Sequence, residues 1–352
     1  MRIIMFTDRF YPHIGGVEKH VEKLSEELIK MEHEVTIFTR RDSYKEFEVY
    51  KGIKIIRLKC DGKFSRIKIF LGILRNISKI IKADVIHCHD YSTFWYWFLP
   101  FRFILPFKKV FITFHGWEGI FPPERKVVKI RKKVEKLTSG NICVGDFITK
   151  WYDTKADKVI YGATDISDLS REEENKVNKS ETSILYLGRL ESDTGIIMYI
   201  EALKNLKKEF GADFSLDVCG TGTLSDSIKK MCDEYEIPTH FHGFVSDVEK
   251  YIINSDYVFT SGYLSILEAM SMKKIVICNY DNELKEDYLK MIPEYNKKII
   301  IADNSEALAN QLNEIIINKN KKDELIQNSY KWVKDMSWTN MAKEYMNLWT
   351  KL

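Results

Sequence analysis

The chain has little proline, few cysteines and no long hydrophobic run. Its 352 residues include 7 prolines and 6 cysteines, and no segment reaches the roughly 18 consecutive apolar residues of a membrane-spanning helix. The cysteines are scattered without a CxxC pair, mostly in or beside apolar strand-like runs, which predicts reduced core thiols of a cytosolic protein. The first residues enter an apolar strand with no charged region ahead of it, so we expect no signal peptide.

The chain as a whole also has no large excess of positive or negative charge, since its formal net charge is only +3. That figure hides a split between the halves. Residues 1–165 hold 31 Lys and Arg against 20 Asp and Glu, a balance of +11, whereas the remainder holds 23 against 31, a balance of −8. This asymmetry predicts that the first half meets an anionic partner.

Two similar segments lie about half a chain apart. Each runs from an apolar strand through a glycine turn into a helix, as MRIIMFTDRFYPHIGGVEKHVEKLSEEL from Met1 and SILYLGRLESDTGIIMYIEALKNLKK from Ser183. Short apolar runs alternate with helical periodicity along the rest, as in a parallel sheet covered by helices on both faces. The sequence therefore predicts an α/β fold of two doubly wound, nucleotide-binding-type domains that face each other across a cleft.

Composition sets the expected boundaries of these domains. We expect an N-terminal domain over 1–167, a polar, charged linker over 168–182 and a second domain over 183–335. The last segment, 336–352, is expected to be a helix with Trp338, Met341, Tyr345 and Trp349 on one face. This face must dock, and packing across the domain junction is one plausible place.

Glycine turns mark candidate anion sites in both halves. Gly15 and Gly16 follow the first strand where a helix begins, and Gly220 and Gly222 precede a helix in the second half. Without a Cβ atom the backbone approaches a ligand closely, and a helix N-terminus attracts an oxyanion. Each turn is also compatible with a purely structural role.

Two charged residues of the second half suggest nucleotide binding. Arg189 follows Gly188 at the end of a predicted strand, where its guanidinium can fork onto two phosphate oxygens; the alternative is a surface pair with Glu191. Glu268 lies near the start of an apolar helix. From spacing alone it either caps that helix or accepts the two hydroxyls of a ribose.

The HCHD segment raises the question of a metal. His87 and His89 share one face of a strand beside Asp90, but no third ligand is evident, so structural roles at the strand end are favoured. We expect no metal site.

The first half carries features of a protein that lies on an anionic lipid surface. The segment Lys63–Lys82 has six basic and no acidic residues around one apolar helical stripe, and Arg125–Leu137 is similar. Nine aromatic residues fall between Tyr91 and Lys109. Basic amphipathic helices beside aromatic residues favour peripheral membrane binding, the alternative being ordinary helices with a solvated face. The basic segments lack interleaved aromatics, which argues against a nucleic-acid partner.

The whole chain resembles the retaining glycosyltransferases of GT-B architecture, in particular the large family 4. The resemblance is carried, over nearly the full length, by FYPHIGGVEKHVEKLSEEL, DVIHCHD, FHG, YLGRL, the GTG turn, HGFV and ILEAM. It implies transfer of a hexose or N-acetylhexosamine from a nucleotide sugar, most simply a UDP- or GDP-sugar, with no cofactor and no metal.

The resemblance also implies roles for individual residues. Gly15 and Gly16 would lie near the donor diphosphate and the acceptor, His115 beside the transferred sugar, Arg189 against the leaving diphosphate and Glu268 on the ribose. Without the resemblance, His115 reads as a structural histidine at a strand end. His115 and Arg189 are thus the expected catalytic residues, and the expected donor-binding set is Gly15, Gly16, Gly188, Arg189, Gly220, Gly222, Ser261, Gly262, Tyr263, Leu264, Ser265 and Glu268.

Two positions depart from the family pattern. Thr194 stands where the family usually has a phosphate-binding lysine, and Thr260 where it usually has a glutamate that binds donor sugar hydroxyls. The rebuilt loop Ser261–Ser265 is expected to supply replacement contacts.

The sequence thus predicts a retaining glycosyltransferase that acts on a lipid-linked or glycan acceptor, peripherally bound to the inner face of the cell membrane. The two departures motivate an alternative, a catalytically silent GT-B protein that binds a lipid or a protein.

Overall fold

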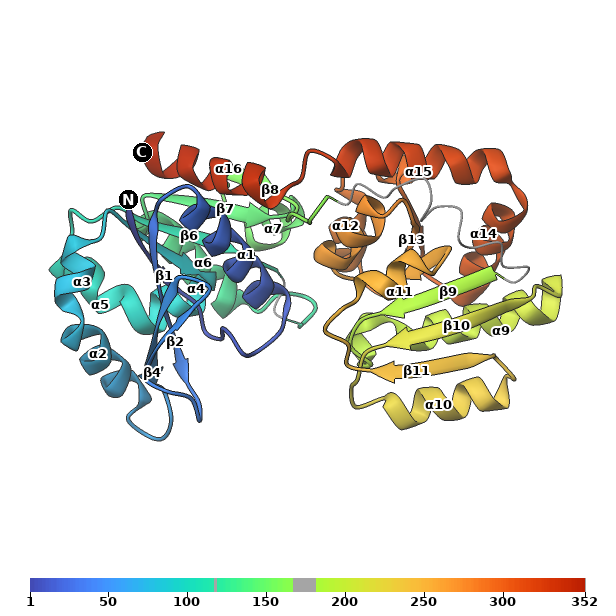
Figure 1. Cartoon of the computed structure of the whole chain (residues 1–352), viewed down its shortest axis with the longest axis horizontal. Helices are drawn as coiled ribbons and strands as arrows, with labels where there is room; N and C mark the ends of the chain where they lie inside the picture. Colours follow the sequence, from blue (N-terminus) through green and yellow to red (C-terminus); the bar gives the residue numbers. More distant parts are fainter. Residues whose placement is uncertain (117–118, 167–181, 352) are drawn as a thin grey trace. The chain divides into compact units, whose positions relative to one another are not determined.

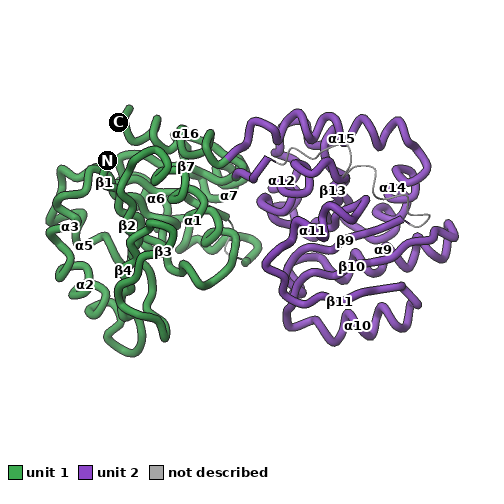
Figure 2. Tube along the Cα trace, viewed as in Figure 1, with its two compact units in different colours: residues 1–162, 338–352 green, residues 163–337 purple. Residues whose placement is uncertain are grey.

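The computed structural model describes residues 1–116, 119–166 and 182–351. The chain forms two compact units, residues 1–162 with 338–352 and residues 163–337 (Figure 2). The expected linker, 168–182, lies outside the described residues except for Thr182, which begins a strand of the second unit.

Unit 1 is built on an eight-stranded sheet of order β3-β4-β2-β1-β5-β6-β7-β8 (Figure 1). Its strands are β1 Arg2–Phe6, β2 Glu34–Arg41, β3 Phe47–Tyr50, β4 Ile53–Lys59, β5 Val85–His89, β6 Val110–Phe114, β7 Gly140–Val144 and β8 Lys158–Ile160. Every residue of β5, β6 and β7 is buried, because helices cover both faces of a parallel sheet. The alternation of apolar runs predicted this arrangement.

The edge strand β3 was not predicted. It pairs antiparallel with β4, with Phe47 opposite Ile56, whereas the other strand pairs of unit 1 are parallel. Its sequence, FEVY, is short and follows charged residues, so its pairing depends on the neighbouring strand rather than on its own pattern.

The helices of unit 1 include one from the far end of the chain. They are α1 Gly16–Lys30, α2 Ser65–Arg75, α3 Ile77–Lys82, α4 Asp90–Thr93, the π-helical turn η1 Phe94–Phe98, α5 Leu99–Ile104, α6 Arg125–Leu137, α7 Phe147–Tyr152 and α16 Trp338–Lys351. Helix α1 buries Val21, Leu24 and Leu28, whose spacing places them on one apolar stripe. Helix α16 packs on α1, so the C-terminal segment belongs to the first unit.

The basic segment Lys63–Lys82 is not one helix. It breaks at Asn76 into α2 and α3, and the Asn76 side-chain amide donates to the Gly72 carbonyl oxygen at 3.0 Å. The buried face consists of Ile69, Ile73 and Ile80. Several apolar residues of this segment, Ile67, Leu74 and Ile81, are exposed instead.

Unit 2 is a six-stranded parallel sheet of order β11-β10-β9-β12-β13-β14. Its strands are β9 Thr182–Leu187, β10 Phe214–Cys219, β11 Thr239–Gly243, β12 Tyr257–Phe259, β13 Ile275–Asn279 and β14 Ile299–Ala302. Its helices are η2 Ser192–Thr194, α9 Ile196–Phe210, α10 Ser225–Glu234, α11 Glu249–Ile253, α12 Tyr263–Ser271, α13 Glu283–Lys290, η3 Tyr295–Lys297, α14 Ser305–Ile317 and α15 Lys319–Val333.

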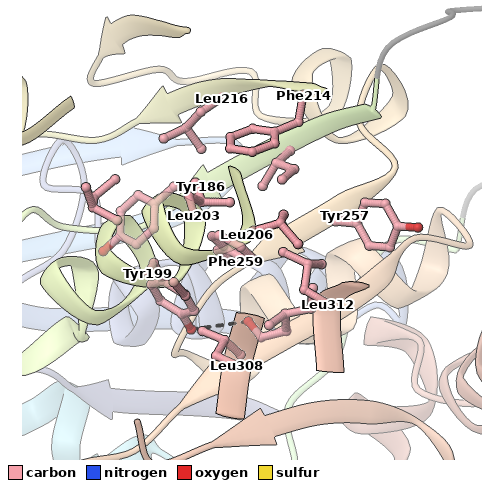
Figure 3. Packing of buried hydrophobic residues seen from close by; sticks show 14 of the residues in the cluster. Tyr186, Tyr199, Leu203, Leu206, Phe214, Leu216, Tyr257, Phe259, Leu308 and Leu312 are labelled. Atoms are coloured by element: carbon pink, nitrogen blue, oxygen red, sulfur yellow. Dashed lines mark hydrogen bonds between the residues drawn. The ribbon is translucent and has the colours of Figure 1, made fainter. Parts of the chain in front are cut away.

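The core of unit 2 lies between this sheet and the paired helices α9 and α14 (Figure 3). The rings of Tyr199 and Phe259 stack there at 4.5 Å, and the Tyr199 hydroxyl donates to the Thr260 carbonyl oxygen at 3.1 Å. This bond anchors the end of β12 from the opposite layer. The loops that follow β9, β10 and β12 thus start from a rigid base.

Candidate functional site

A cluster of four histidines lies at the centre of unit 1. His87 and His89 come from β5, His115 follows β6 and His20 comes from α1. The His20 and His115 rings lie 4.7 Å apart and the His89 and His115 rings 5.1 Å apart. Because β5 and β6 are parallel neighbours, their carboxyl ends bring these side chains together. We call these four residues the histidine cluster.

A continuous hydrogen-bonded chain joins α16 to this cluster. His20 Nε2 lies 2.8 Å from the Tyr345 hydroxyl, which lies 2.8 Å from Thr113 Oγ1, which lies 2.8 Å from His87 Nε2. Trp349 Nε1 donates to His87 Nδ1 at 3.0 Å. An indole nitrogen only donates, so His87 carries its proton on Nε2. The sequence placed Tyr345 and Trp349 on one apolar face but gave no sign that their polar atoms meet histidines.

A second pair of bonds holds His115. Its Nε2 lies 2.8 Å from His89 Nδ1, and its backbone N–H donates to Asp90 Oδ1 at 2.9 Å. Asp90 has a φ of 65°, in the left-handed region that a non-glycine residue adopts at a cost. The HCHD segment thus positions the strand end around His115.

Burial keeps the histidine cluster neutral. Desolvation lowers the pKa of His20, His87 and His89 well below the ordinary value, and it lowers the pKa of His115 to about 3, with the nearby charge of Arg131 adding to the effect. Burial also raises the pKa of Asp90, against the opposing effect of Arg131.

Arg131 is a residue that the sequence analysis missed. From the sequence it is one of the basic residues around the apolar stripe of Arg125–Leu137, but in the structure it is fully buried. Its Nη2 donates to the Gly116 carbonyl oxygen at 2.9 Å, and its guanidinium lies 3.9 Å from the centre of the Tyr152 ring. A basic residue on a basic helix gives no sequence signal of burial, because only the tertiary partners stabilise it there.

The turn before α1 has an extended backbone at Gly15. A Cβ atom at this position would come within 2.4 Å of a carboxylate oxygen of Glu18, whose pKa is raised by burial. Gly15 therefore leaves room for an acidic group in the first turn of α1, where the helix dipole favours negative charge. Gly16 is the first residue of the helix.

In unit 2, Arg189 lies in the loop after β9 and its side chain is 67% exposed. Its Nη2 pairs with Asp193 Oδ2 at 2.8 Å. The alternative partner considered from the sequence, Glu191, instead accepts hydrogen bonds from the backbone and hydroxyl of Thr223.

The glycines of the second half have a packing function. A Cβ atom at Gly220 would lie 1.8 Å from the Gly188 carbonyl oxygen, and one at Gly222 would lie 2.2 Å from the Leu190 carbonyl oxygen. The turn after β10 thus packs directly against the loop that carries Arg189. Since neither position leaves space for a side chain, both glycines fix the course of that loop.

Thr194, which replaces the family's lysine, points inward. It is buried, its hydroxyl donates to the Glu191 carbonyl oxygen at 2.7 Å, and its Oγ1 accepts from the Tyr186 hydroxyl at 2.9 Å. It therefore closes the loop rather than presenting a charge.

A cation does reach the same loop from another element. Lys285 of α13 donates from Nζ to the Asp193 carbonyl oxygen at 2.5 Å, and it lies 3.1 Å from Asp281. Asp193 thus joins the Arg189 guanidinium and the Lys285 ammonium. Lys285 was not predicted from the sequence, because nothing in its local pattern connects α13 with a loop about ninety residues earlier.

Helix α12 begins just after β12, with Gly262 as its N-cap. Glu268 is the sixth residue of this helix and is half-buried. A glutamate that caps a helix stands at its third residue, so Glu268 lies too far along the helix for the capping role considered from the sequence. The rebuilt loop is held by local bonds: Thr260 Oγ1 donates to Ser265 Oγ at 2.7 Å, and Tyr263 stacks on the Tyr288 ring at 3.9 Å. Ser261, Gly262 and Leu264 are half-buried.

Comparison with known proteins gives two family matches that together span most of the chain. Residues 14–167 match the model of glycosyltransferase family 4, and residues 169–332 match that of the glycosyl transferases group 1. The boundary between the two matches falls beside the boundary of the two units.

Individual proteins agree with this result. An uncharacterized glycosyltransferase of Methanocaldococcus jannaschii is 25% identical over 99% of this chain and 98% of its own length. The alpha-monoglucosyldiacylglycerol synthase of Streptococcus pneumoniae is 26% identical over 82% of this chain and 74% of its own length. Among solved structures, Anabaena HepE in complex with UDP and glucose superimposes with a TM-score of 0.78 over the full length of both chains at 14% identity, which shows a shared fold.

Proposed function

Because the chain belongs to the GT-B glycosyltransferases of the family 4 type, we propose that it transfers a sugar, with retention of configuration, from a nucleotide sugar to a lipid-linked or glycan acceptor at the cytoplasmic surface of a membrane. In this proposal unit 2 binds the donor and unit 1 binds the acceptor. The observation that carries the donor assignment is the pair of cations that meet at Asp193, Arg189 from the loop after β9 and Lys285 from α13, at the carboxyl edge of the unit 2 sheet.

These cations supply what a departing nucleoside diphosphate requires. Negative charge develops on the leaving phosphates, and donors that are already in place stabilise it without reorganisation. Arg189 offers a planar fork for two phosphate oxygens and Lys285 adds a second positive charge. We propose that this pair, with the N-terminus of α12, replaces both the missing lysine and any need for a metal ion.

The remaining donor contacts in this proposal lie at the same carboxyl edge of the unit 2 sheet. We propose that Glu268 accepts the ribose hydroxyls and that the backbone of Ser261–Ser265 holds the phosphates and the sugar. Gly188, Gly220 and Gly222 act by shaping the Arg189 loop. The UDP and glucose bound by HepE, which has the same fold, support a UDP-sugar, with a GDP-sugar as the alternative.

In unit 1 we propose that His115 contacts the transferred hexose or N-acetylhexosamine and that Gly15 and Gly16 lie near the donor phosphates and the acceptor. Four buried or half-buried histidines, neutral at physiological pH, give this site hydrogen-bonding groups without adding charge.

The acceptor proposal rests on an exposed surface of α2 and α5 that combines apolar and basic side chains. The two helices pack together through the stacked rings of Phe70 and Phe101, 5.0 Å apart, and both lie on the same side of unit 1 (Figure 1). We call this the basic–apolar surface, and its exposed members are Phe64, Ile67, Leu71, Leu74, Phe103, Ile104 and Phe107 with Lys63, Arg66 and Arg75.

Such a surface suits a membrane interface. The Phe107 side chain is 98% exposed, and an exposed apolar group beside basic residues favours insertion between anionic headgroups, to which each basic residue contributes about 1 kcal/mol. Within the described residues, no helix has the length and apolar content needed to cross a bilayer. A lipid acceptor also agrees with the relative that is a glucosyldiacylglycerol synthase.

Liposome flotation tests the membrane contact. The double variant Phe103→Ser/Phe107→Ser is expected to lose most of its binding to vesicles that contain anionic phospholipid at moderate salt. Phe244→Ser, which removes an exposed phenylalanine from unit 2, is the matched control and should float like the parent. Equal flotation of all three proteins would contradict this assignment of the surface.

Donor binding is tested by calorimetry with UDP- and GDP-sugars. Arg189→Ala and Glu268→Ala should each weaken nucleotide binding, by about tenfold or more for the loss of a charge-assisted bond. Arg41→Ala removes an arginine that pairs with Glu46 at the same 2.8 Å, and it should bind donor like the parent. Unchanged affinity in both site variants would contradict the donor site.

The alternative, a catalytically silent GT-B protein, draws on the inward-facing Thr194 and Thr260. Slow release of nucleoside diphosphate from a nucleotide sugar separates the two, because a transferase leaks to water and a silent binding protein does not. Release that disappears in Arg189→Ala supports the enzyme.

A further inference from the structure

The bond between His89 and His115 holds one proton between two ring nitrogens. His89 Nδ1 and His115 Nε2 lie 2.8 Å apart, and both rings are neutral because burial disfavours the imidazolium. In a neutral pair, one nitrogen donates and the other accepts. Which ring donates decides which nitrogen of His115 carries a proton.

The surroundings of His89 distinguish the two arrangements. His89 is 1% exposed, and its Nε2 has no hydrogen-bond partner among the described residues. If His115 donated, His89 would carry its proton on Nε2 and bury an N–H group without an acceptor. If His89 donates from Nδ1, only an acceptor lone pair stays unpaired. Orphaned buried N–H groups are rarer than unsatisfied acceptors, so the second arrangement is favoured.

We infer that His89 is a positioning residue that donates from Nδ1 to His115 Nε2 and fixes His115 as the tautomer with its proton on Nδ1. His115 then offers a hydrogen-bond donor, not a base, to the ligand of unit 1. The inference deepens the proposed function and rests on it, since it takes the contact between His115 and the sugar from there. The ligand group that this donor recognises is an acceptor oxygen, such as a sugar hydroxyl.

Two further contacts restrict the His115 ring. Its backbone N–H donates to Asp90 Oδ1 at 2.9 Å, and its ring lies perpendicular to the His20 ring, with the two centroids 4.7 Å apart and an interplanar angle of 88°. No hydrogen bond joins His115 Nδ1 to another described residue, and the residue is only half-buried. The Nδ1 side of the ring is thus the side available to a ligand.

Nuclear magnetic resonance of ring-labelled histidine in the full-length protein tests the tautomer directly, without any substrate. The His115 signal is assigned by its loss in His115→Gln, and at pH 7 we expect a proton on Nδ1 and none on Nε2. His89→Asn keeps an amide donor close to the position of Nδ1 and should preserve this tautomer, whereas His89→Ala removes the donor and should shift His115 toward Nε2–H. A parent protein with its His115 proton on Nε2 would overturn the inference.

Kinetics test whether the tautomer serves the site. With a UDP- or GDP-sugar, His89→Ala should lower kcat by about tenfold, as expected for one misoriented hydrogen bond, and His89→Asn should recover most of it. A changed tautomer with unchanged kcat would refute the link to the site. A parent protein with the expected tautomer but no turnover of donor would contradict the proposed function while supporting the inferred tautomer. Circular dichroism confirms that each variant is folded.

Discussion

Lowering the pH from 7 to 5 is expected to destabilise unit 1 selectively. Its histidine cluster stays neutral when folded, because burial holds the pKa of His20, His87 and His89 well below the ordinary value and that of His115 at about 3. In the unfolded chain each titrates near 6.5. Between these values the unfolded state binds more protons, so stability is fully present above about pH 6.5 and is lost as the pH falls.

The size of the effect follows from the number of these histidines. A residue that titrates at about 6.5 only when unfolded loses about 2 kcal/mol of stability between pH 7 and pH 5. The four members of the histidine cluster together lose about 8 kcal/mol, which is comparable with the whole unfolding free energy of about 5–15 kcal/mol of a domain. The two histidines of unit 2, His240 and His242, are exposed.

Urea unfolding followed by tryptophan fluorescence measures this loss. Apart from Trp332, every tryptophan of the chain lies outside unit 2, so the fluorescence reports almost entirely on the N-terminal half and α16. The window stays above the ordinary pKa of carboxyl groups. The buried carboxyls Asp90 and Glu18, whose pKa values burial raises, act in the opposite direction, because the folded state then binds more protons than the unfolded state. We expect the unfolding free energy of unit 1 to fall steeply and nearly linearly below pH 6.

A matched variant keeps the test independent of overall stability. His87→Asn removes one titrating ring, so its loss between pH 7 and pH 5 should be smaller than that of the parent by about 2 kcal/mol, even if the variant is less stable at pH 7. A parental loss below about 2 kcal/mol in total would refute the neutral, buried state of the cluster.

Three further substitutions test the packing around the candidate site. Tyr345→Phe leaves two buried polar partners without their shared hydroxyl and should lower the urea stability of unit 1 by about 2 kcal/mol, while unchanged stability would contradict the hydrogen-bonded chain. Gly195→Ala should lower the stability of unit 2 by more than about 1 kcal/mol, because φ is 74° and a Cβ atom would overlap the Asn279 side chain at 1.9 Å; parental melting monitored by circular dichroism would speak against this loop geometry. Thr194→Lys should destabilise unit 2 without tightening UDP binding in calorimetry, since position 194 points into the loop, and a gain in affinity would show that the loop reopens.

The sequence predicted much of the fold. Strands that are buried on both faces appear as continuous apolar runs, and α1 shows its inward face through Val21, Leu24 and Leu28. The two family matches confirm the glycosyltransferase assignment that the motifs indicated. The roles given to Arg189, Glu268 and His115 stay predictions.

Other features had no local signal. The antiparallel β3 depends on β4, the break at Asn76 divides an apparently continuous helix, and Arg131 is buried although its neighbours are basic. Each of these depends on partners that a window of sequence does not contain.

The amino-acid sequence by itself determined which stretches are strands and helices, which faces of them are apolar and which family of folds they build, because periodicity and turn chemistry are local properties of the chain. Only the tertiary structure decided that Tyr345 meets His20 across 325 positions and that Lys285 reaches the loop of Arg189. Hydrogen bonds and ion pairs are directional and short, so they exist only once distant elements have been packed to within about 3 Å of one another.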